Sequence, residues 1–353
     1  MVRYNYYMKN KYLIRMAISM VGAVILFMFV VNNSWMYKSP VAKVLAVHNN
    51  GNKQSIELRL ENGSDKGKTV YVKNKYDKSQ VYDERYFKHD YVFLNDEYTG
   101  ITGVKRDYWV AAIFLFLLSS LITVGGKRGT YTSLCILGNI ALFGIIIYMN
   151  MRGVDILYMT IAGTVVFTFF VLLVVDGLSH RMMLSFAAAL LTTLLLSSLV
   201  MLLIWHTDID YDFLHFLPEP FTTTDANHFF LAQIIIGCLG AVIDVSVTIT
   251  AACMELIERT PSISNKSLLR SVREVADDIN GTMISVVLLT NIASTLPIFL
   301  ISMSNEIGFR TVVSHDAYFY IVRSLTGMLS IVVAILVSTF ITSLVARKEL
   351  KHD

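Results

Sequence analysis

Long apolar runs separated by short polar stretches make up most of the chain, apart from one polar segment near the N-terminus. A helix that crosses a bilayer needs about 20 mostly apolar residues. Eight runs are long enough, and we expect each to form a transmembrane helix. They cover residues 13–31, 108–124, 133–149, 156–175, 184–204, 229–252, 282–303 and 327–346.

The first run begins after several basic residues, as a signal peptide does. However, residues 31–35 offer no small-residue cleavage site, and the apolar run is long for a signal sequence. We therefore interpret residues 1–31 as a cytoplasmic N-terminus followed by an uncleaved anchor helix.

The polar segment 32–107 has the alternating pattern of β-strands. Residues 55–60 alternate polar and apolar side chains, and Asn62-Gly63 is typical of a turn. A small barrel of the OB or SH3 type is the expected fold. It would be either a binding module or a folded spacer, because a fold alone does not give a function. The expected strands are residues 41–47, 55–60, 69–72, 91–94 and 100–104.

Composition supports a membrane protein, since 54% of the residues are hydrophobic and only 16% are charged. The sequence therefore predicts a polytopic α-helical membrane protein of about eight transmembrane helices with a small extracytoplasmic β domain. Basic residues are not interleaved with aromatic ones, so nucleic-acid binding has no support. No catalytic motif or cofactor-binding loop is present, and we predict neither enzyme activity nor a cofactor.

The basic residues of short loops predict the orientation. The acidic loop 206–228 contains no lysine or arginine, which predicts that it lies outside. Both termini are then cytoplasmic, and residues 32–107 are extracytoplasmic at the plasma membrane. Inside loops are expected at 125–132, 176–183 and 253–281, and the other outside loops contain Arg152, Arg310 and Arg323. Transmembrane helices 2–5 are expected within 108–205, and helices 6–8 within 229–353.

The run at 229–252 contains an aspartate near its centre. Gly237, Asp244 and Glu255 are spaced by seven and eleven residues, which brings them to one helix face at about 100° per residue. Small residues let another helix approach closely, so we expect this face to pack and Asp244 to point into the bundle. A membrane aspartate costs about 2.5–3.5 kcal/mol and is typical of proton or cation sites. A helix-packing aspartate is the alternative.

The next segment is expected to be a cytoplasmic amphipathic helix at about 264–276, lying on the inner membrane surface or on the bundle. In the following span, Asn291 and Thr295 share a face, and Pro297 is expected to kink the helix. The transport or coupling candidates are therefore Asp244, Glu255, Asp278, Asn291 and Thr295. The helix-packing candidates are Gly237, Gly240, Gly281 and Pro297.

Three carboxylates in the acidic loop, Asp208, Asp210 and Asp212, have the spacing of a calcium loop. Phe213 stands where that loop needs a glycine, so we assign no metal site. The three residues are weak candidates for cation binding, and a solvated acidic rim is the alternative.

Four segments, 237–245, 254–256, 278–283 and 296–297, read GCLGAVIDV, MEL, DINGTM and LP. With these segments the sequence resembles the YibE/F family of bacterial multispanning proteins. Ala276 and Asp277 depart from the family pattern, which has Gly-Arg there. The resemblance implies an anchor helix, a β-rich outside domain and a helical region, but no assigned activity. It also implies a homo-oligomer, or a hetero-oligomer with a paralogous membrane subunit, in the lipid bilayer.

A weaker similarity is to the RND and SecD/SecF permeases, which are proton-driven. The shared order is a central Asp244, an inner Glu255, an inside helix and the sequence 295–297, TLP. These features favour a secondary transporter or permease subunit of unknown substrate, coupled to protons or a cation through Asp244. The alternative is a non-transporting assembly protein whose β domain binds an envelope partner.

Overall fold

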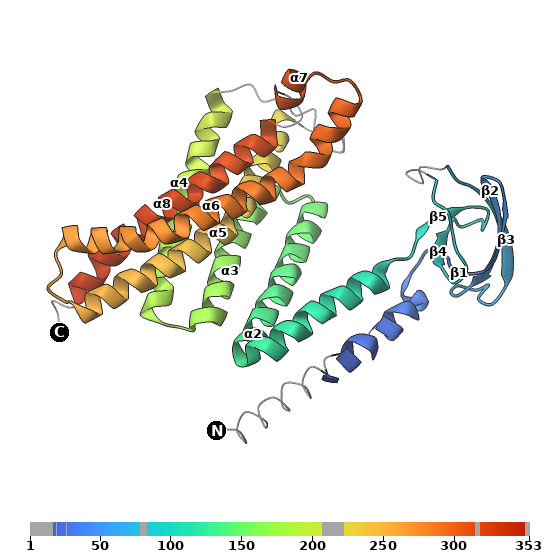
Figure 1. The fold of residues 1–353 in the computed structure, drawn as a ribbon, viewed down its shortest axis with the longest axis horizontal. Helices are drawn as coiled ribbons and strands as arrows, with labels where there is room; N and C mark the ends of the chain where they lie inside the picture. The colour runs from blue at the N-terminus through green and yellow to red at the C-terminus, as the bar shows by residue number, and fades with distance from the viewer. Residues whose placement is uncertain are drawn as a thin grey trace. The chain divides into compact units, whose positions relative to one another are not determined.

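The computed structural model describes residues 17–18, 20–25, 27–77, 83–206, 222–314 and 318–349 (Figure 1). The chain forms two compact units, Met1–Ser133 and Leu134–Asp353.

A five-stranded antiparallel sheet dominates the first unit. Its strands are β1 (Val41–Asn50), β2 (Lys53–Leu60), β3 (Thr69–Lys75), β4 (Tyr91–Leu94) and β5 (Ile101–Val104). The order β3-β2-β1-β4-β5 leaves β3 and β5 as edges, so the described strands do not close into the expected barrel. The five expected strands are confirmed, because alternating side chains such as Ile56 and Leu58 are fully buried on one face.

The turn after β2 depends on its sequence. Gly63 has φ 77°, a conformation that glycine adopts at little cost. The side chain of Asn62 is buried, and its Oδ1 accepts a 2.7 Å hydrogen bond from the backbone N–H of Val41. This bond fixes the start of β1 beside the turn.

A fully buried lysine joins the sheet to its neighbouring helices in the first unit. Nζ of Lys105 lies 2.9 Å from Oδ1 of Asp107 and donates to the carbonyl of Val30 at 2.7 Å. The Tyr37 hydroxyl donates to the same carboxylate. Burial and the neighbouring carboxylate raise the pKa of Tyr37 to about 12. The ammonium group also lies within 6.0 Å of the ring centroids of Tyr37, Tyr91 and Tyr108.

Helix α2 (Asp107–Met151) contains two of the expected spans. Gly126 interrupts the helical backbone with φ 56° and ψ −125°, in the predicted basic turn at 125–132. A side chain at Gly129 would collide with the backbone of Leu121. The two glycines therefore allow the chain to turn tightly between the two expected spans.

The second unit continues from Leu134 with long helices. They are α3 (Ile156–Asp176), α4 (His180–His206), α5 (Thr223–Arg259), α6 (Asn265–Ser304), the short α7 (Phe309–Ser314) and α8 (Tyr318–Glu349). Among the described residues of the whole chain, six helices are long and apolar enough to cross a membrane, with α2 as one of them. A shorter apolar helix, Met20–Val31, corresponds to the first expected span.

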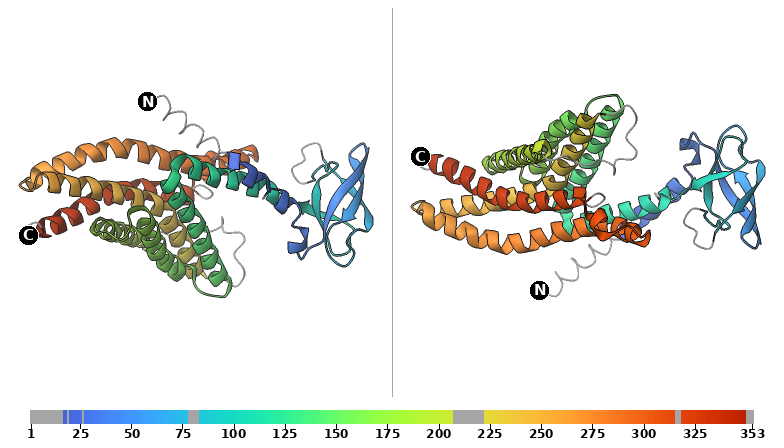
Figure 2. Two further views of the ribbon diagram at one scale, coloured as in Figure 1. Left: turned by 90° about the horizontal axis from the view of Figure 1, so that it is seen from below. Right: turned by 90° about the horizontal axis from the view of Figure 1, so that it is seen from above.

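Helices α4, α5 and α8 pack against one another at the centre of this unit. Helices α5 and α8 lie side by side in the views of Figure 2. Two contacts show that α5 and α8 run in the same direction: the ring of Phe230 packs on that of Phe319, and the hydroxyl of Thr342 donates to that of Thr250.

The expected amphipathic segment is the first part of α6 and not a separate helix, since α6 runs unbroken from Asn265 to Ser304. Leu268, Val272 and Ala276 are buried in the core shared with α5 and α8. Of the two expected locations, the apolar side of this segment therefore packs on the bundle.

Candidate functional site

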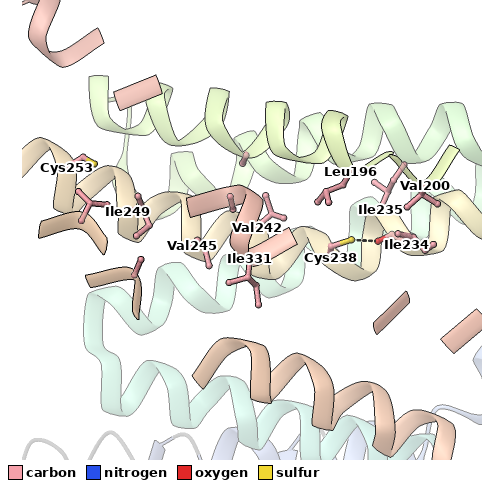
Figure 3. Close-up of a cluster of buried hydrophobic side chains, with 14 of the residues drawn as sticks. Leu196, Val200, Ile234, Ile235, Cys238, Val242, Val245, Ile249, Cys253 and Ile331 are labelled. Atoms are coloured by element: carbon pink, nitrogen blue, oxygen red, sulfur yellow. Dashed lines mark hydrogen bonds between the residues drawn. The ribbon is translucent and has the colours of Figure 1, made fainter. Parts of the chain in front are cut away.

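The two sides of α5 differ sharply in this structure. One side is buried and includes Val242, Val245, Ile249 and Cys253, which Figure 3 shows beside residues of α4 and α8. Ser246 and Thr250 are fully buried on this side as well. The buried side is therefore made of compact side chains that fit closely between neighbouring helices.

The other side of α5 carries the predicted residues. Gly237, Gly240, Asp244 and Glu255 are all exposed, and we call them the open face of α5. Asp244 lies on the side of α5 away from the buried core shared with α4 and α8, where it is exposed toward α3 and the last part of α2. Nothing lies within 4 Å of a Cβ placed on Gly240, so the expected helix packing there has no partner within the described residues.

Asp244 lines a groove of about 430 Å³ between α3, α5 and the last part of α2. The walls are apolar, with Asn139 and Asp244 as the two polar side chains. Oδ1 of Asn139 is buried and has no hydrogen-bond partner among the described residues. The groove therefore places a carboxylate in apolar surroundings together with an asparagine whose amide oxygen lacks a donor, an arrangement that suits a proton donor or a cation.

Arg323 is a further charged residue beside this face, and our sequence analysis placed it wrongly in an outside loop. Helix α8 begins at Tyr318, so Arg323 lies inside a helix that is apolar enough to cross a membrane. Its Nε donates a 2.9 Å hydrogen bond to Oδ1 of Asn291 in α6. A Cβ on Gly237 would lie 3.6 Å from its Cδ. Aromatic residues precede the expected apolar run and extend the helix. They could have indicated that Arg323 is helical.

The other predicted residues are scattered. Glu255 is 63% exposed and forms a 2.6 Å ion pair with Arg259 in the next turn of α5. Asp278 is exposed on α6, and Gly281 has open space around it, so neither meets another helix of the described chain. The structure brings Asn291 to Arg323, but it does not bring Glu255 or Asp278 to Asp244.

Two predicted residues lie further along α6. Thr295 is buried, and its hydroxyl donates to the carbonyl of Asn291 at 2.8 Å. Pro297 lies within α6, which continues to Ser304. Thr295 thus bonds back to the preceding turn of α6. Pro297, two residues later, has no N–H to donate to the carbonyl of Ala293.

A larger groove, of about 1050 Å³, lies between α4, α6 and α8. Its lining is mostly apolar, and its polar end includes Arg273, Asp277 and Asn280. None of the predicted coupling residues lines this groove. We therefore do not assign the predicted proton or cation coupling to it.

A histidine–aspartate pair joins the start of α5 to the start of α3. Nδ1 of His228 lies 2.6 Å from Oδ2 of Asp155, whose Oδ1 accepts from the N–H of Leu157. Partial burial of Asp155 disfavours its charge, but these contacts outweigh that effect and hold its pKa below the usual value.

The acidic-loop candidates Asp208, Asp210 and Asp212 lie outside the described residues. Within the described part of the chain, no group of three or more His, Cys, Asp or Glu side chains could hold a metal ion.

The long apolar helices and the small N-terminal sheet define a multi-pass membrane protein with one β domain. Residues 112–348 match the family model described as YibE/F-like protein, and residues 35–106 match the YibE/F family N-terminal domain. These matches span nearly the whole chain, so the protein belongs to the YibE/F family, which confirms the resemblance. No curated protein and no solved structure matches the chain.

Proposed function

We propose that this protein is a secondary transporter or permease subunit that couples transport to protons or a cation through Asp244. In this proposal about eight helices cross a bacterial plasma membrane, both termini are cytoplasmic, and the β domain is extracytoplasmic. The substrate is unknown.

The main support is the groove beside Asp244. A carboxylate in an apolar groove within a membrane helix is costly unless it is neutralised by a proton, a cation or another partner. The orphan oxygen of Asn139 in the same groove also needs a donor. Both groups therefore favour a ligand that brings protons or positive charge.

The test is proton flux in proteoliposomes that contain a pH-sensitive dye, with and without an imposed membrane potential. Asp244→Asn should abolish flux and leave folding intact, because the amide keeps the shape of the side chain but cannot take up a proton. Glu258→Gln is the matched control, since Glu258 is an exposed carboxylate on the same helix. Equal flux in wild type and Asp244→Asn would contradict the proposal.

A second candidate function is assembly through the β domain. Edge strand β3 has unpaired backbone groups and an outward Tyr71 that is 71% exposed. Such edges bind partners by adding a strand. If Tyr71→Glu abolishes a cellular phenotype that Asp244→Asn leaves unchanged, this second function is favoured.

A further inference from the structure

Arg323 has no function in the coupling proposed above, although it lies in a helix that is apolar enough to cross a membrane. An arginine within a transmembrane helix is rare and marks a functional position by default. Arg323 lies in the second turn of α8 and is partly buried. The residues around Arg323 should therefore indicate why a positive charge is placed there.

The surroundings hold the guanidinium group in a defined orientation. The amide of Asn291 donates through Nδ2 to the carbonyl of Val287 at 2.8 Å, which turns its Oδ1 toward Nε of Arg323. The guanidinium carbon lies 5.3 Å from the ring centroid of Tyr320. A hydrogen bond and an aromatic ring thus orient the guanidinium group, whereas a solvated surface arginine is free to change its conformation.

The protein leaves most of this cation unsatisfied. Of the five N–H donors of a guanidinium group, Nε is the one with a hydrogen-bond acceptor among the described residues. No described Asp or Glu forms an ion pair with Arg323. Asp244 is seven residues beyond Gly237, which is about 10 Å along α5, so it does not neutralise the arginine.

Gly237 lies beside the aliphatic stem of Arg323. It is exposed, and a Cβ placed on it would lie 3.6 Å from Cδ and 3.8 Å from Cγ of the arginine. The remaining donors of a guanidinium form a planar fork that matches the two oxygens of a carboxylate or phosphate. The position therefore combines an oriented cation with paired donors that have no acceptor among the described residues.

We propose that Arg323 binds the oxyanion of an anionic ligand, a carboxylate or phosphate group, beside Gly237 on the open face of α5. The oxyanion belongs either to a lipid headgroup or to a soluble anion. Asn291 and Tyr320 are positioning residues for the guanidinium group. This binding is independent of proton uptake by Asp244.

The experiment uses the full chain in a non-ionic, phosphate-free detergent with isothermal titration calorimetry. One arm titrates inorganic phosphate and, separately, acetate; the other titrates short-chain phosphatidylglycerol. Wild type should bind in at least one arm, and Arg323→Gln should weaken that binding by about tenfold or more, because charge-assisted hydrogen bonds are lost. Binding in the first arm identifies a soluble anion, and binding in the second arm alone identifies a lipid headgroup.

Arg152→Gln is the matched control. Arg152 also lies over a tyrosine, at 5.2 Å from the ring centroid of Tyr148, but it is exposed at the end of α2. This variant should bind as wild type does. Arg323→Lys keeps the charge without the fork, so it should bind more weakly than wild type and more tightly than Arg323→Gln; it also serves if the glutamine variant does not fold.

The proposal is overturned if wild type binds in neither arm, if Arg323→Gln or Arg323→Lys binds as wild type does, or if Arg152→Gln loses as much affinity. Asp244→Asn should retain oxyanion binding. A protein that binds oxyanions but shows no proton flux would refute the proposed coupling and leave the oxyanion site in place.

Discussion

The buried side and the open face of α5 are made of different residues, although they belong to the same helix. The buried side has compact, mostly β-branched side chains such as Val245 and Ile249, in contact with α4 and α8. The open face has two glycines and two carboxylates. Gly237 lies beside the stem of Arg323 and Asp244 lines the groove beside α3, whereas Gly240 has open space around it and Glu255 pairs within its own helix. Close packing explains the first set of residues and does not explain the second.

This difference matters because lipid gives helices little hydrophobic reason to associate. Helix contacts in a membrane depend on van der Waals fit and on hydrogen bonds between helices, such as the 3.5 Å contact between Thr250 and Thr342. A carboxylate that contributes to neither is retained for another reason. We infer that the buried side determines stability and the open face determines function.

The largest expected effect on stability comes from shortening a buried side chain. Ile249→Ala should lower the free energy of unfolding by about 2–5 kcal/mol, because Ile249 is fully buried and the cavity cannot collapse completely. Thermal unfolding of the purified protein measures this loss. Ile236→Ala, the same change on the exposed side of α5, should cost less than about 1 kcal/mol. Equal losses would abolish the distinction between the two sides.

Two glycine-to-alanine substitutions give a second test, because we expect them to change the free energy of unfolding in opposite directions. A methyl group at Gly138 would overlap the ring of Phe170, so Gly138→Ala should destabilise the protein by about 1–3 kcal/mol. Gly240 has open space around it, and Gly240→Ala should stabilise α5 by about 0.5–1 kcal/mol. Chemical denaturation of both variants measures the two changes. If Gly240→Ala instead dissociates an oligomer, then a second subunit covers the open face.

The N-terminal end of α5 allows a test by pH, because His228 there contacts Asp155. The lowered pKa of Asp155 means that its contribution is present above its ordinary pKa of 3.8 and is lost as the pH falls through the folded-state value. Asp155→Asn should cost about 1 kcal/mol at neutral pH, since asparagine still caps α3 but loses the charged contact with His228. Melting temperatures of wild type and variant, measured from neutral pH downward, should converge below about pH 4. A constant difference at all pH values would show that the charge of Asp155 is not responsible.

The smallest expected effect on stability is at Asp244, the residue through which we propose that transport is coupled. Asp244→Asn should change the free energy of unfolding by less than about 0.5 kcal/mol, because the side chain is exposed and has no partner in the described chain. The same thermal unfolding assay measures it, beside the flux assay. A large loss of stability would favour the helix-packing interpretation of this aspartate.

The β domain was largely predictable because its pattern is local. Alternation in residues 55–60 gave β2, and Asn62-Gly63 gave the turn, since both depend on neighbouring residues. The closure of the sheet was not predictable, because it depends on whether β3 and β5 meet, and no local pattern specifies that.

The sequence by itself determined the membrane class, the family, the apolar helices and the stripe of Gly237, Asp244 and Glu255, because composition and a period of 3.6 residues are properties of the chain alone. Only the tertiary structure decided that this stripe is the open face of α5, that α6 is continuous, and that Arg323 lies in a helix against Asn291. The physical reason is that helical periodicity fixes which residues share a face. The neighbouring helices, brought together from distant parts of the sequence, fix what that face meets.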